Sequence, residues 1–336
     1  MEIIDLSINL DKNNIEKSKK FLSFFPHTYN DIDVLFYIES LEQFAASDFN
    51  DLFKHQDKIG EFDYASFFDV VETSINNLNK RWLNFFNHHD IKLNVVLTYN
   101  DDISIIEKYK NINKLIIKCK KEEFDIVKIH DTYKKYGLPI DIKVQGVAAS
   151  LISSDDEILK SLMDYFPTWI KDKEGVLLLP YAKFIDNALG GSYRLCVNDS
   201  CIGKYFYMDN KGDIYTCNKP CLAKYCYGNI SSINSLDDVY LSKHFERFVS
   251  KNIERRRDCQ NCLAFKKCQG GCSSDSLLNN GKLEKINEIY CKNYKLLQDF
   301  IKQEIKKIVD GQMSLKELNP SMKLMVINSL KVENRL

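Results

Sequence analysis

Cysteine is the residue type in this sequence whose number and spacing point most directly to chemistry. Ten of the eleven cysteines lie between Cys196 and Cys291, and only Cys119 precedes them. Thiolates ligate zinc and iron–sulfur clusters, and a dense group of cysteines in a reducing compartment usually binds metal. The odd number of cysteines, their clustering and the lack of a secretion-signal pattern argue against a disulfide framework. We therefore expect metal centres in residues 196–291.

The downstream cysteines follow one another closely, separated by two, five, three and 18 residues. They are Cys259, Cys262, Cys268, Cys272 and Cys291. Gly270 and Gly271 lie between Cys268 and Cys272, and paired glycines let a backbone turn tightly around a bulky inorganic core. Four cysteines can hold either zinc or an iron–sulfur cluster, so the residues alone leave both metals open.

The upstream cysteines surround a predicted β-hairpin. Cys196 and Cys201 precede a strand pattern over residues 204–209, and a second strand over residues 213–217 ends at Cys217. The residues between the two strands have the composition of a turn. The hairpin is therefore expected to return Cys217 to the neighbourhood of the other two cysteines.

This series of cysteines resembles the seven-cysteine pattern of the SPASM domain, the C-terminal module of many radical S-adenosylmethionine (SAM) enzymes that modify peptides. The resemblance covers residues 196–297. It includes the ten residues between Cys201 and Gly212, the four between Gly212 and Cys217, and the whole downstream series. Cys196 stands where such enzymes often place an eighth ligand. The resemblance implies two auxiliary [4Fe–4S] clusters, each with four thiolate ligands.

The family pattern also implies which cysteines share a cluster. One cluster would be held by Cys196, Cys201, Cys217 and Cys272. The other would be held by Cys259, Cys262, Cys268 and Cys291. Cys221 and Cys226 are left over as ordinary thiols near a cluster, although either could replace Cys196 or Cys201. Zinc is the alternative metal for the same ligands.

Residues 1–190 alternate between strand-like and helix-like stretches. Short apolar runs predict strands over residues 2–10, 34–38, 93–99, 115–119, 140–144 and 176–179. Apolar residues at three- and four-residue spacing predict helices over residues 67–85, 122–136 and 154–166. This alternation indicates parallel βα units. We expect an α/β fold with a partial (β/α)6 barrel of radical SAM type in residues 1–190, a SPASM domain in 191–298 and a helical tail in 299–336.

A ligand site in such a barrel would lie at the carboxyl ends of the strands. The candidate residues there are Asn100, Asp101, Cys119, Lys120, Gln145 and Tyr181. The alternative for each of them is a loop or cap residue, and a single cysteine such as Cys119 is more often a small buried hydrophobe. His88 and His89 end a predicted helix, where histidine favours the negative end of the helix dipole.

Two motifs of the enzymes that this sequence resembles are missing. Those enzymes carry CxxxCxxC after the first barrel strand and a GGE-like motif after the second, and the two motifs hold a cluster and SAM. Here no cysteine precedes Cys119 and no glycine pair precedes Gly190–Gly191. The sequence therefore resembles a degenerate, or pseudo, radical SAM protein, and no SAM is expected as a cofactor.

Such proteins are encoded beside ribosomally made peptides (RiPPs) and the enzymes that modify them. One group is the SPASM-domain peptide maturases of grasp-with-spasm systems, where an ATP-grasp ligase is the partner, and another accompanies true radical SAM enzymes. The resemblance implies an accessory or maturase protein that binds a precursor peptide or a partner enzyme. The alternatives are a peptide-modifying enzyme that does not cleave SAM and an iron–sulfur electron-transfer protein.

The charge balance excludes other classes of partner. Lys plus Arg number 47 and Asp plus Glu number 47, so the formal net charge is zero, which argues against nucleic-acid binding. No apolar run approaches the roughly 18 residues of a membrane span, and a cytoplasmic location is expected. Arg255–Arg257 are expected to form a solvated face or to attract an acidic peptide.

Overall fold

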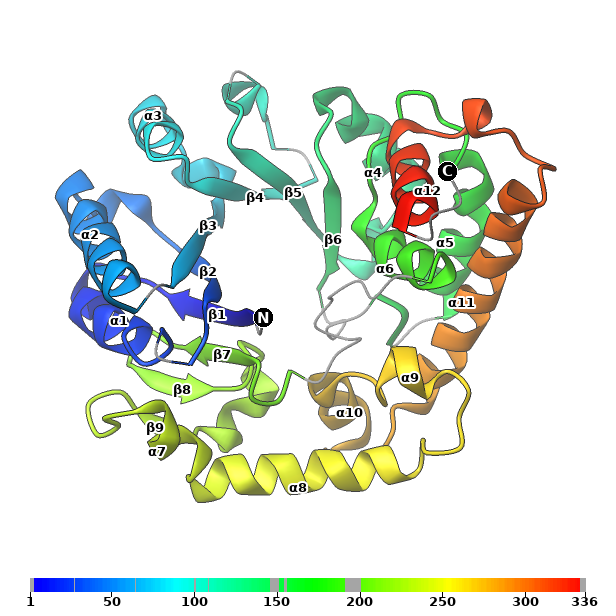
Figure 1. The fold of residues 1–336 in the computed structure, drawn as a ribbon. Helices are drawn as coiled ribbons and strands as arrows, with labels where there is room; N and C mark the ends of the chain where they lie inside the picture. Colours follow the sequence, from blue (N-terminus) through cyan, green and yellow to red (C-terminus); the bar gives the residue numbers. More distant parts are fainter. Residues whose placement is uncertain are drawn as a thin grey trace. The chain divides into compact units, whose positions relative to one another are not determined.

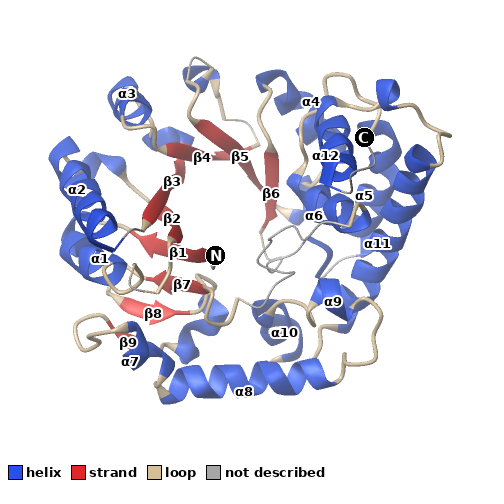
Figure 2. Ribbon diagram, viewed as in Figure 1, coloured by secondary structure: helices blue, strands red, loops and turns tan. Residues whose placement is uncertain are grey.

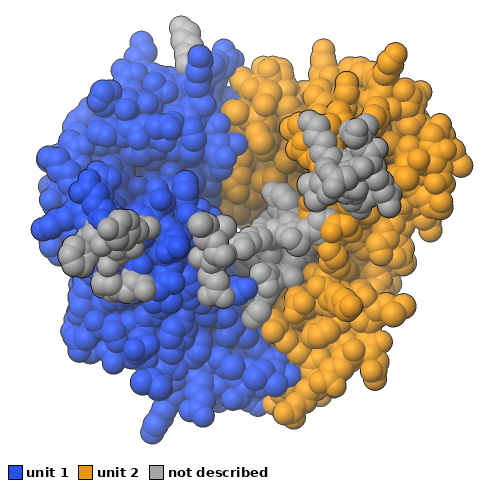
Figure 3. Space-filling view, in the orientation of Figure 1, with its two compact units in different colours: residues 1–96, 101–113, 200–253 blue, residues 97–100, 114–199, 254–336 orange. Residues whose placement is uncertain are grey.

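The computed structural model describes residues 3–26, 28–63, 65–99, 101–107, 109–145, 151–153, 156–190 and 201–332. Asn100, Gly191, Cys196 and the first residue of the helix predicted over residues 154–166 lie outside these residues. The chain divides into two compact units. Unit 1 comprises residues 1–96, 101–113 and 200–253, and unit 2 comprises residues 97–100, 114–199 and 254–336 (Figure 3).

Unit 1 contains parallel strands with helices between them (Figure 1). The strands are β1 (Ile3–Asn9), β2 (Asp31–Ile38), β3 (Ser66–Ser74) and β4 (Lys92–Thr98), and each pairs in parallel with the next. The helices are α1 (Ile15–Leu22), α2 (Ala46–Asp63) and α3 (Lys80–His88). Alternate residues of β2, among them Ile32, Val34 and Phe36, are fully buried, as a strand with one apolar face requires.

The predicted hairpin is confirmed and extends the sheet of unit 1. β7 (Tyr205–Met208) pairs in parallel with β1, β8 (Asp213–Tyr215) pairs antiparallel with β7, and β9 (Gly228–Asn229) pairs antiparallel with β8. Gly212 makes the turn between β7 and β8 with a φ of 90°, a conformation that L-residues rarely adopt. Two helices follow β9 in the sequence, namely α7 (Leu236–Tyr240) and α8 (Lys243–Arg257).

Unit 2 contains most of β5 (Ile112–Cys119), which pairs in parallel with β6 (Ile140–Val144). Helix α4 (Ile126–Tyr133) lies between these two strands in the sequence. The order of the nine described strands is β6-β5-β4-β3-β2-β1-β7-β8-β9 (Figure 2). The other helices of unit 2 are α5 (Asp156–Trp169), α6 (Leu179–Ala188), α9 (Phe265–Cys268), α10 (Ser273–Asn280), α11 (Glu288–Val309) and α12 (Pro320–Val332).

Helix α11 packs along α6 and α5 and completes the core of unit 2 (Figure 1). Its buried polar side chains reach backbone and side-chain groups of the earlier elements. The Asn293 amide donates to the carbonyl oxygen of Ile152 (3.2 Å), and the Gln298 amide donates to that of Phe184 (3.2 Å). Within the described part of the chain, no helix combines the length and the apolar character that crossing a membrane requires.

Two secondary-structure predictions are wrong. The helix predicted over residues 67–85 is instead β3, a short 3-10 turn and α3, because the aromatic and β-branched residues of β3 form a ladder between β2 and β4. The strand predicted over residues 176–179 makes only one bridge, between Leu178 and Ile140, and the chain turns at once into α6, with Pro180 in its first turn.

The helix predicted over residues 122–136 is shorter than expected. Residues 121–123 form a separate 3-10 turn, and α4 begins after Asp125, whose carboxylate accepts a hydrogen bond from the Lys128 backbone N–H (3.0 Å). A second 3-10 turn over residues 134–136 ends at Gly137, where φ is 69°. The predicted stop at Gly137 is therefore confirmed, and a capping aspartate sets the start.

Candidate metal centre

Four of the predicted ligands lie together in unit 2. Cys259 and Cys262 occupy a turn after α8, in which the Cys262 N–H donates to the Cys259 carbonyl oxygen (2.9 Å). Cys268 ends the short helix α9, and Cys291 lies in the first turn of α11. The side chain of Asn287 caps α11 by accepting a hydrogen bond from the Tyr290 N–H (3.1 Å). Local turns and caps thus position every one of the four thiols.

All four cysteines line one small cavity. Its lining consists of Cys259, Cys262, Ala264, Phe265, Cys268, Gly270, Ile286, Tyr290, Cys291, Tyr294 and Lys295. Apart from Lys295, the lining side chains are aromatic, aliphatic or sulfur-bearing. The cavity therefore offers four soft ligands in an apolar setting, the combination that thiolate-ligated metal centres use.

The thiols of this site act on one another electrostatically. Burial, followed by the negative charges of the nearby Cys268, Cys291 and Cys262, raises the pKa of Cys259 to about 11. Burial is also the main cause of the raised pKa of Cys268. Four thiolates at this site need a compensating positive charge, and a coordinated metal would provide it because metal binding deprotonates thiol ligands.

Gly270 and Gly271 shape the loop around the site. Their φ angles are 81° and 76°, in the left-handed region that glycine adopts without strain. The backbone N–H groups of both glycines lie against the Cys268 sulfur and favour its thiolate form. Gly271 also approaches the Tyr290 ring so closely that a Cβ atom would stand 3.0 Å from the ring. The predicted tight turn is confirmed.

The other predicted ligand set is spread over both units. Cys201 and Cys217 belong to unit 1, where both sulfurs raise the pKa of the buried Tyr227 phenol after the main effect of burial. Cys272 belongs to unit 2, is buried, and has its sulfur 3.2 Å from the Ser274 hydroxyl. Cys196 lies outside the described residues. The assembly of these four into one site stays a prediction.

The other described cysteines are Cys119, Cys221 and Cys226. None of the ten described cysteines forms a disulfide. The Cys226 thiol donates weakly to the Gly228 carbonyl oxygen (3.6 Å), and burial is the main cause of its raised pKa. Cys221 is half-buried. Cys119 is a small buried residue whose pKa burial raises to about 11.

Of the described barrel candidates, Asp101 is half-buried in the loop after β4, and the other three besides Cys119 occupy core or loop positions. Tyr181 is fully buried in α6 and donates to the Leu162 carbonyl oxygen (2.7 Å), so it fills the core instead of facing a ligand. Lys120 and Gln145 are exposed, and their backbone N–H groups bond Glu123 and the Cys119 carbonyl oxygen. The alternative interpretation, loop and cap residues, describes them better.

Arg255 is the residue at this site that the sequence analysis misjudged. It is buried, only 1% exposed, whereas Arg257 is exposed, so the solvated-face interpretation is wrong for Arg255. Its guanidinium donates to the Gly271 carbonyl oxygen (3.2 Å), the Ser273 and Ser276 hydroxyls and the Leu283 carbonyl oxygen. Helical periodicity could have indicated that Arg255 is buried, because Phe248, Asn252 and Arg255 lie on one buried face of α8.

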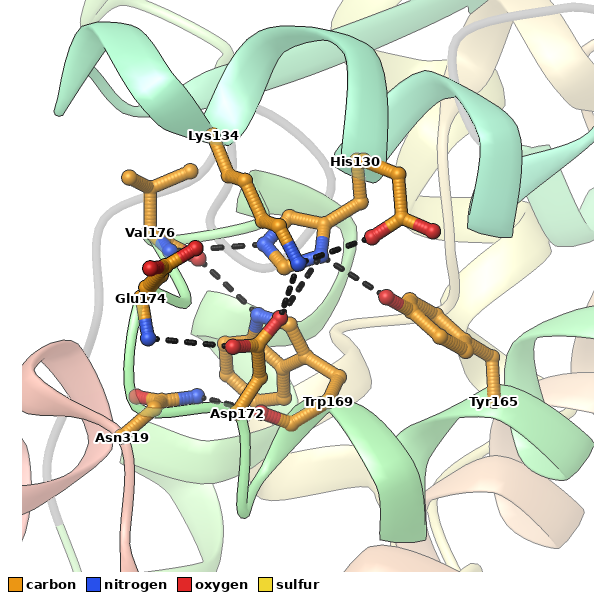
Figure 4. Close-up of polar contacts among 9 residues, drawn as sticks. His130, Lys134, Tyr165, Trp169, Asp172, Glu174, Val176 and Asn319 are labelled. Atoms are coloured by element: carbon orange, nitrogen blue, oxygen red, sulfur yellow. Dashed lines mark hydrogen bonds and ion pairs between the residues drawn. The ribbon is translucent and has the colours of Figure 1, made fainter.

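A second polar cluster in unit 2 surrounds His130 (Figure 4). Possible ligand atoms of His130, Asp131 and Asp172, one from each residue, lie within 4.8 Å of one another, as in a metal site. The His130 Nδ1 atom lies 2.7 Å from the Tyr165 hydroxyl, and the Val176 N–H donates to Nε2 (3.4 Å). Both ring nitrogens are thereby engaged. Burial lowers the pKa of His130 although Asp172 lies near, and this favours the neutral form of the imidazole.

Comparison with known proteins identifies the fold. No family model matches the sequence. The cysteine-type anaerobic sulfatase-maturating enzyme of Clostridium perfringens (strain ATCC 13124) is 24% identical over 140 residues, which are 41% of this chain and 37% of the relative. The serine-type enzyme of Bacteroides thetaiotaomicron (strain ATCC 29148) is 22% identical over 197 residues, 56% of this chain and 46% of the relative. The matches thus span less than half the length of these relatives.

Solved structures match over nearly the whole chain. Histidine-tagged anSMEcpe with bound AdoMet (that is, SAM) has a TM-score of 0.70 at 15% identity and covers 92% of this chain and 99% of its own. Native anSMEcpe with bound AdoMet and the Cp18Cys peptide has a TM-score of 0.70 at 15% identity and covers 93% and 100%. The chain therefore has the α/β fold of the anaerobic sulfatase-maturating enzymes, which are maturases of the radical SAM/SPASM type.

Proposed function

We propose that this chain is an accessory maturation protein that binds a precursor peptide or a partner modifying enzyme and carries two [4Fe–4S] clusters. The proposed ligands are Cys196, Cys201, Cys217 and Cys272 for one cluster and Cys259, Cys262, Cys268 and Cys291 for the other. The observation that carries the proposal is a four-cysteine cavity on a radical SAM-type fold that has no cysteine between its first barrel strand and Cys119.

The residues of the four-cysteine site suit an iron–sulfur cluster. They supply four thiols, N–H groups aimed at the Cys268 sulfur, an apolar lining and neighbouring cations. Hydrogen bonds to sulfur and a low local polarity are features by which proteins tune such clusters. A [4Fe–4S] cluster held there supplies one-electron chemistry. The protein's own contribution is to hold the thiolates, exclude water and set the local charge.

The segment after β1 supports the absence of SAM chemistry. The Asp11 carboxylate accepts a hydrogen bond from the Asn13 N–H (2.7 Å), and the Asn14 side chain accepts one from the Asp11 N–H (3.0 Å). These bonds start a short 3-10 turn that leads directly into α1. A compact, self-capped turn thus stands where the enzymes of this fold carry their cluster-binding motif.

Side chains of unit 1 occupy the sheet face next to that turn. The Tyr205 hydroxyl on β7 donates to the buried Ser7 hydroxyl on β1 (2.6 Å). Tyr37 on β2 lies near both, and burial followed by the negative charge of Glu72 on β3 raises its pKa. A hydroxyl-rich surface of this kind suits a polar substrate such as a peptide backbone. This surface supports the proposal of peptide binding, and one solved structure of anSMEcpe contains the Cp18Cys peptide.

The test begins with anaerobically purified protein. We expect about eight iron and eight sulfide atoms per chain, two clusters of four each. No 5′-deoxyadenosine should form with SAM and dithionite. Stoichiometric zinc that iron and sulfide cannot replace would refute the cluster assignment, and SAM cleavage would refute the accessory role.

The partner is tested by pull-down and calorimetry with the peptide and the enzymes encoded beside this gene. Binding at micromolar concentration is expected, and substitution of Tyr205 by Lys should weaken it without loss of iron. Lys211→Glu, in the exposed turn after β7, is the matched control. Absence of binding to all of these candidates would contradict the accessory role.

A second candidate function, electron transfer, is favoured by one observation. Cys291 and Lys295 also line a wider, open pocket together with Asp258, Asn280, Lys285, Ile286, Glu288 and Lys292. The four-cysteine site is therefore close to solvent, as electron exchange with a partner requires. Reversible reduction together with no affinity for any peptide would favour this function over the accessory role.

A further inference from the structure

Two lysines of unit 2 lie against the four-cysteine site, and one of them is buried. We propose that Lys183 and Lys295 set the reduction potential of the cluster held by Cys259, Cys262, Cys268 and Cys291, by offsetting its negative charge. The inference rests on the proposed cluster at this site and goes beyond it by assigning residues to the control of its potential.

Lys183 lies on α6, far from the cysteines in sequence, and is 4% exposed. Its ammonium is 4.7 Å from the centre of the Phe184 ring, 5.7 Å from that of Tyr290 and 5.8 Å from that of Tyr294. Both tyrosines line the four-cysteine cavity. Lysine is almost never buried to this extent without compensation, because removing an ammonium from water is costly. The aromatic faces offset part of that cost.

The buried ammonium lies beside the four-cysteine cavity, because the Tyr290 and Tyr294 rings that it contacts are part of the cavity lining. A charge in such an apolar setting is screened less than a charge in water, so it acts more strongly on a charged group held in the cavity.

Lys295 acts from the open side. It lies one turn after Cys291 on α11, lines the cavity, and interacts through its ammonium with the sulfurs of Cys291 and Cys262. Its side chain is exposed, so water screens its charge more than that of Lys183. We therefore assign the larger effect to Lys183.

Charge explains the direction of the effect. A [4Fe–4S] cluster with four thiolates is anionic, and reduction adds one electron and one further negative charge. A nearby cation stabilises the reduced state more than the oxidised state and raises the potential.

Two neighbouring cations have other assignments. Arg255 also favours the thiolate of Cys259, but its hydrogen bonds to four groups make it the support of the cysteine loop. Lys292 pairs with Asp156 (2.8 Å) at the surface. Neither is suited to a clean test of charge.

The experiment replaces Lys183 and Lys295 by Met, singly, in the full-length protein. Met retains length and apolar bulk and removes the charge. Lys302→Met, on an exposed turn of the same helix α11, is the control. Iron and sulfide are quantified first, and each cluster's midpoint potential is then measured by anaerobic redox titration followed by electron paramagnetic resonance.

We expect Lys183→Met to keep its iron and sulfide and to show one midpoint shifted to a more negative value. A tenfold fall in the ratio of reduced to oxidised cluster at fixed potential corresponds to about 59 mV for one electron. Lys295→Met should shift the same midpoint potential less. Lys295→Arg, which keeps the positive charge, should have the wild-type midpoint potential. The other midpoint serves as an internal reference and should not move, nor should either midpoint in Lys302→Met.

The outcomes separate the inference from the proposed function. Wild-type protein without a cluster at this site refutes the proposed function before any variant is measured. If the wild-type protein carries the cluster, the Lys183→Met variant tests the inference. A midpoint potential in this variant that is unchanged, raised, or shifted together with that of the other cluster overturns the inference. If Lys183→Met loses the cluster, Lys295→Met decides, and an unchanged midpoint there overturns the inference as well.

Discussion

Gly271 and Tyr290 are in such close contact that a Cβ atom on the glycine would lie 3.0 Å from one ring carbon of the tyrosine and 3.1 Å from the next. Tyr290 is buried and lines the four-cysteine cavity, so its ring has little room to move. The glycine therefore allows the loop with Cys268 and Cys272 to lie directly against the first turn of α11.

Substitution of Gly271 by Ala tests this contact. Gly281→Ala is the matched control, because Gly281 also has a positive φ (65°) but no atom within 4 Å of the added Cβ. Both variants pay the conformational cost of about 1–2 kcal/mol for a left-handed alanine. Only Gly271→Ala must also displace Tyr290, at about 1–3 kcal/mol more. Denaturant unfolding and iron content should both show the difference, and equal losses in the two variants would contradict it.

Arg255→Met should be strongly destabilising. It leaves the carbonyl oxygens of Gly271 and Leu283 and two serine hydroxyls without their buried donor, at about 1–3 kcal/mol for each group left unsatisfied. Arg257→Met, two residues further on an exposed position of the same helix, should change the free energy of unfolding by less than about 0.5 kcal/mol. Chemical denaturation measures both, and a similar small effect in each would show that Arg255 does not support the loop.

Cys272→Ala should lower the iron content and the melting temperature more than Cys119→Ala. Both cysteines are buried, but only Cys272 is a proposed ligand. Loss of the Cys119 thiol leaves a small cavity, at a cost on the order of 1 kcal/mol. Loss of a ligand removes metal-binding free energy that contributes directly to folding. Iron analysis and thermal unfolding under anaerobic conditions provide the comparison, and an equal response would refute the ligand assignment of Cys272.

The His130 cluster predicts a pH dependence of stability. Burial lowers the pKa of His130 in the folded protein, so the neutral ring is present there and the unfolded chain takes up a proton at a higher pH. The free energy of unfolding should therefore decrease as the pH falls below the ordinary histidine value of about 6.5, by about 1.4 kcal/mol for each unit by which the pKa is lowered.

His130→Gln, which keeps a polar group but does not titrate, should remove this part of the pH dependence. His88→Gln, at an exposed position, should leave it in place. Denaturant unfolding at pH values on both sides of 6.5 (about 5.5 and about 7.5) separates the two variants. An unchanged pH profile in His130→Gln would show that another group is responsible.

Local sequence pattern predicted the strands that contain compact β-branched runs. β1, β4 and β5 were expected within three residues of their observed bounds, and β6 was expected with its observed bounds. β3 was not, because Phe67, Val70 and Val71 also fit a helical period. Its conformation is decided by pairing with β2 and β4, which are distant in sequence. Such non-local pairing leaves no mark in a short window of sequence.

The candidate site shows the same division. Spacing alone grouped the five downstream cysteines, Cys272 among them, and only the family resemblance implied the set Cys259, Cys262, Cys268 and Cys291. Neither spacing nor resemblance predicted the cationic side chains around the site. Arg255 was hidden within a run of three arginines, and Lys183 comes from α6, whose proximity to the site depends on the packing of α11.

The position of α11 also sets an order of events during synthesis of the chain. Cys291 is the last of the four cavity cysteines to leave the ribosome, and the residues that bond Ile152 and Phe184 follow it on the same helix. Until α11 emerges, α5 and α6 lack their covering helix and the four-thiol cavity lacks one wall. Domains fold as units while apolar surfaces left open invite aggregation. Loading of the proposed cluster therefore requires α11 and is a late step, and until then the nascent chain exposes this apolar surface.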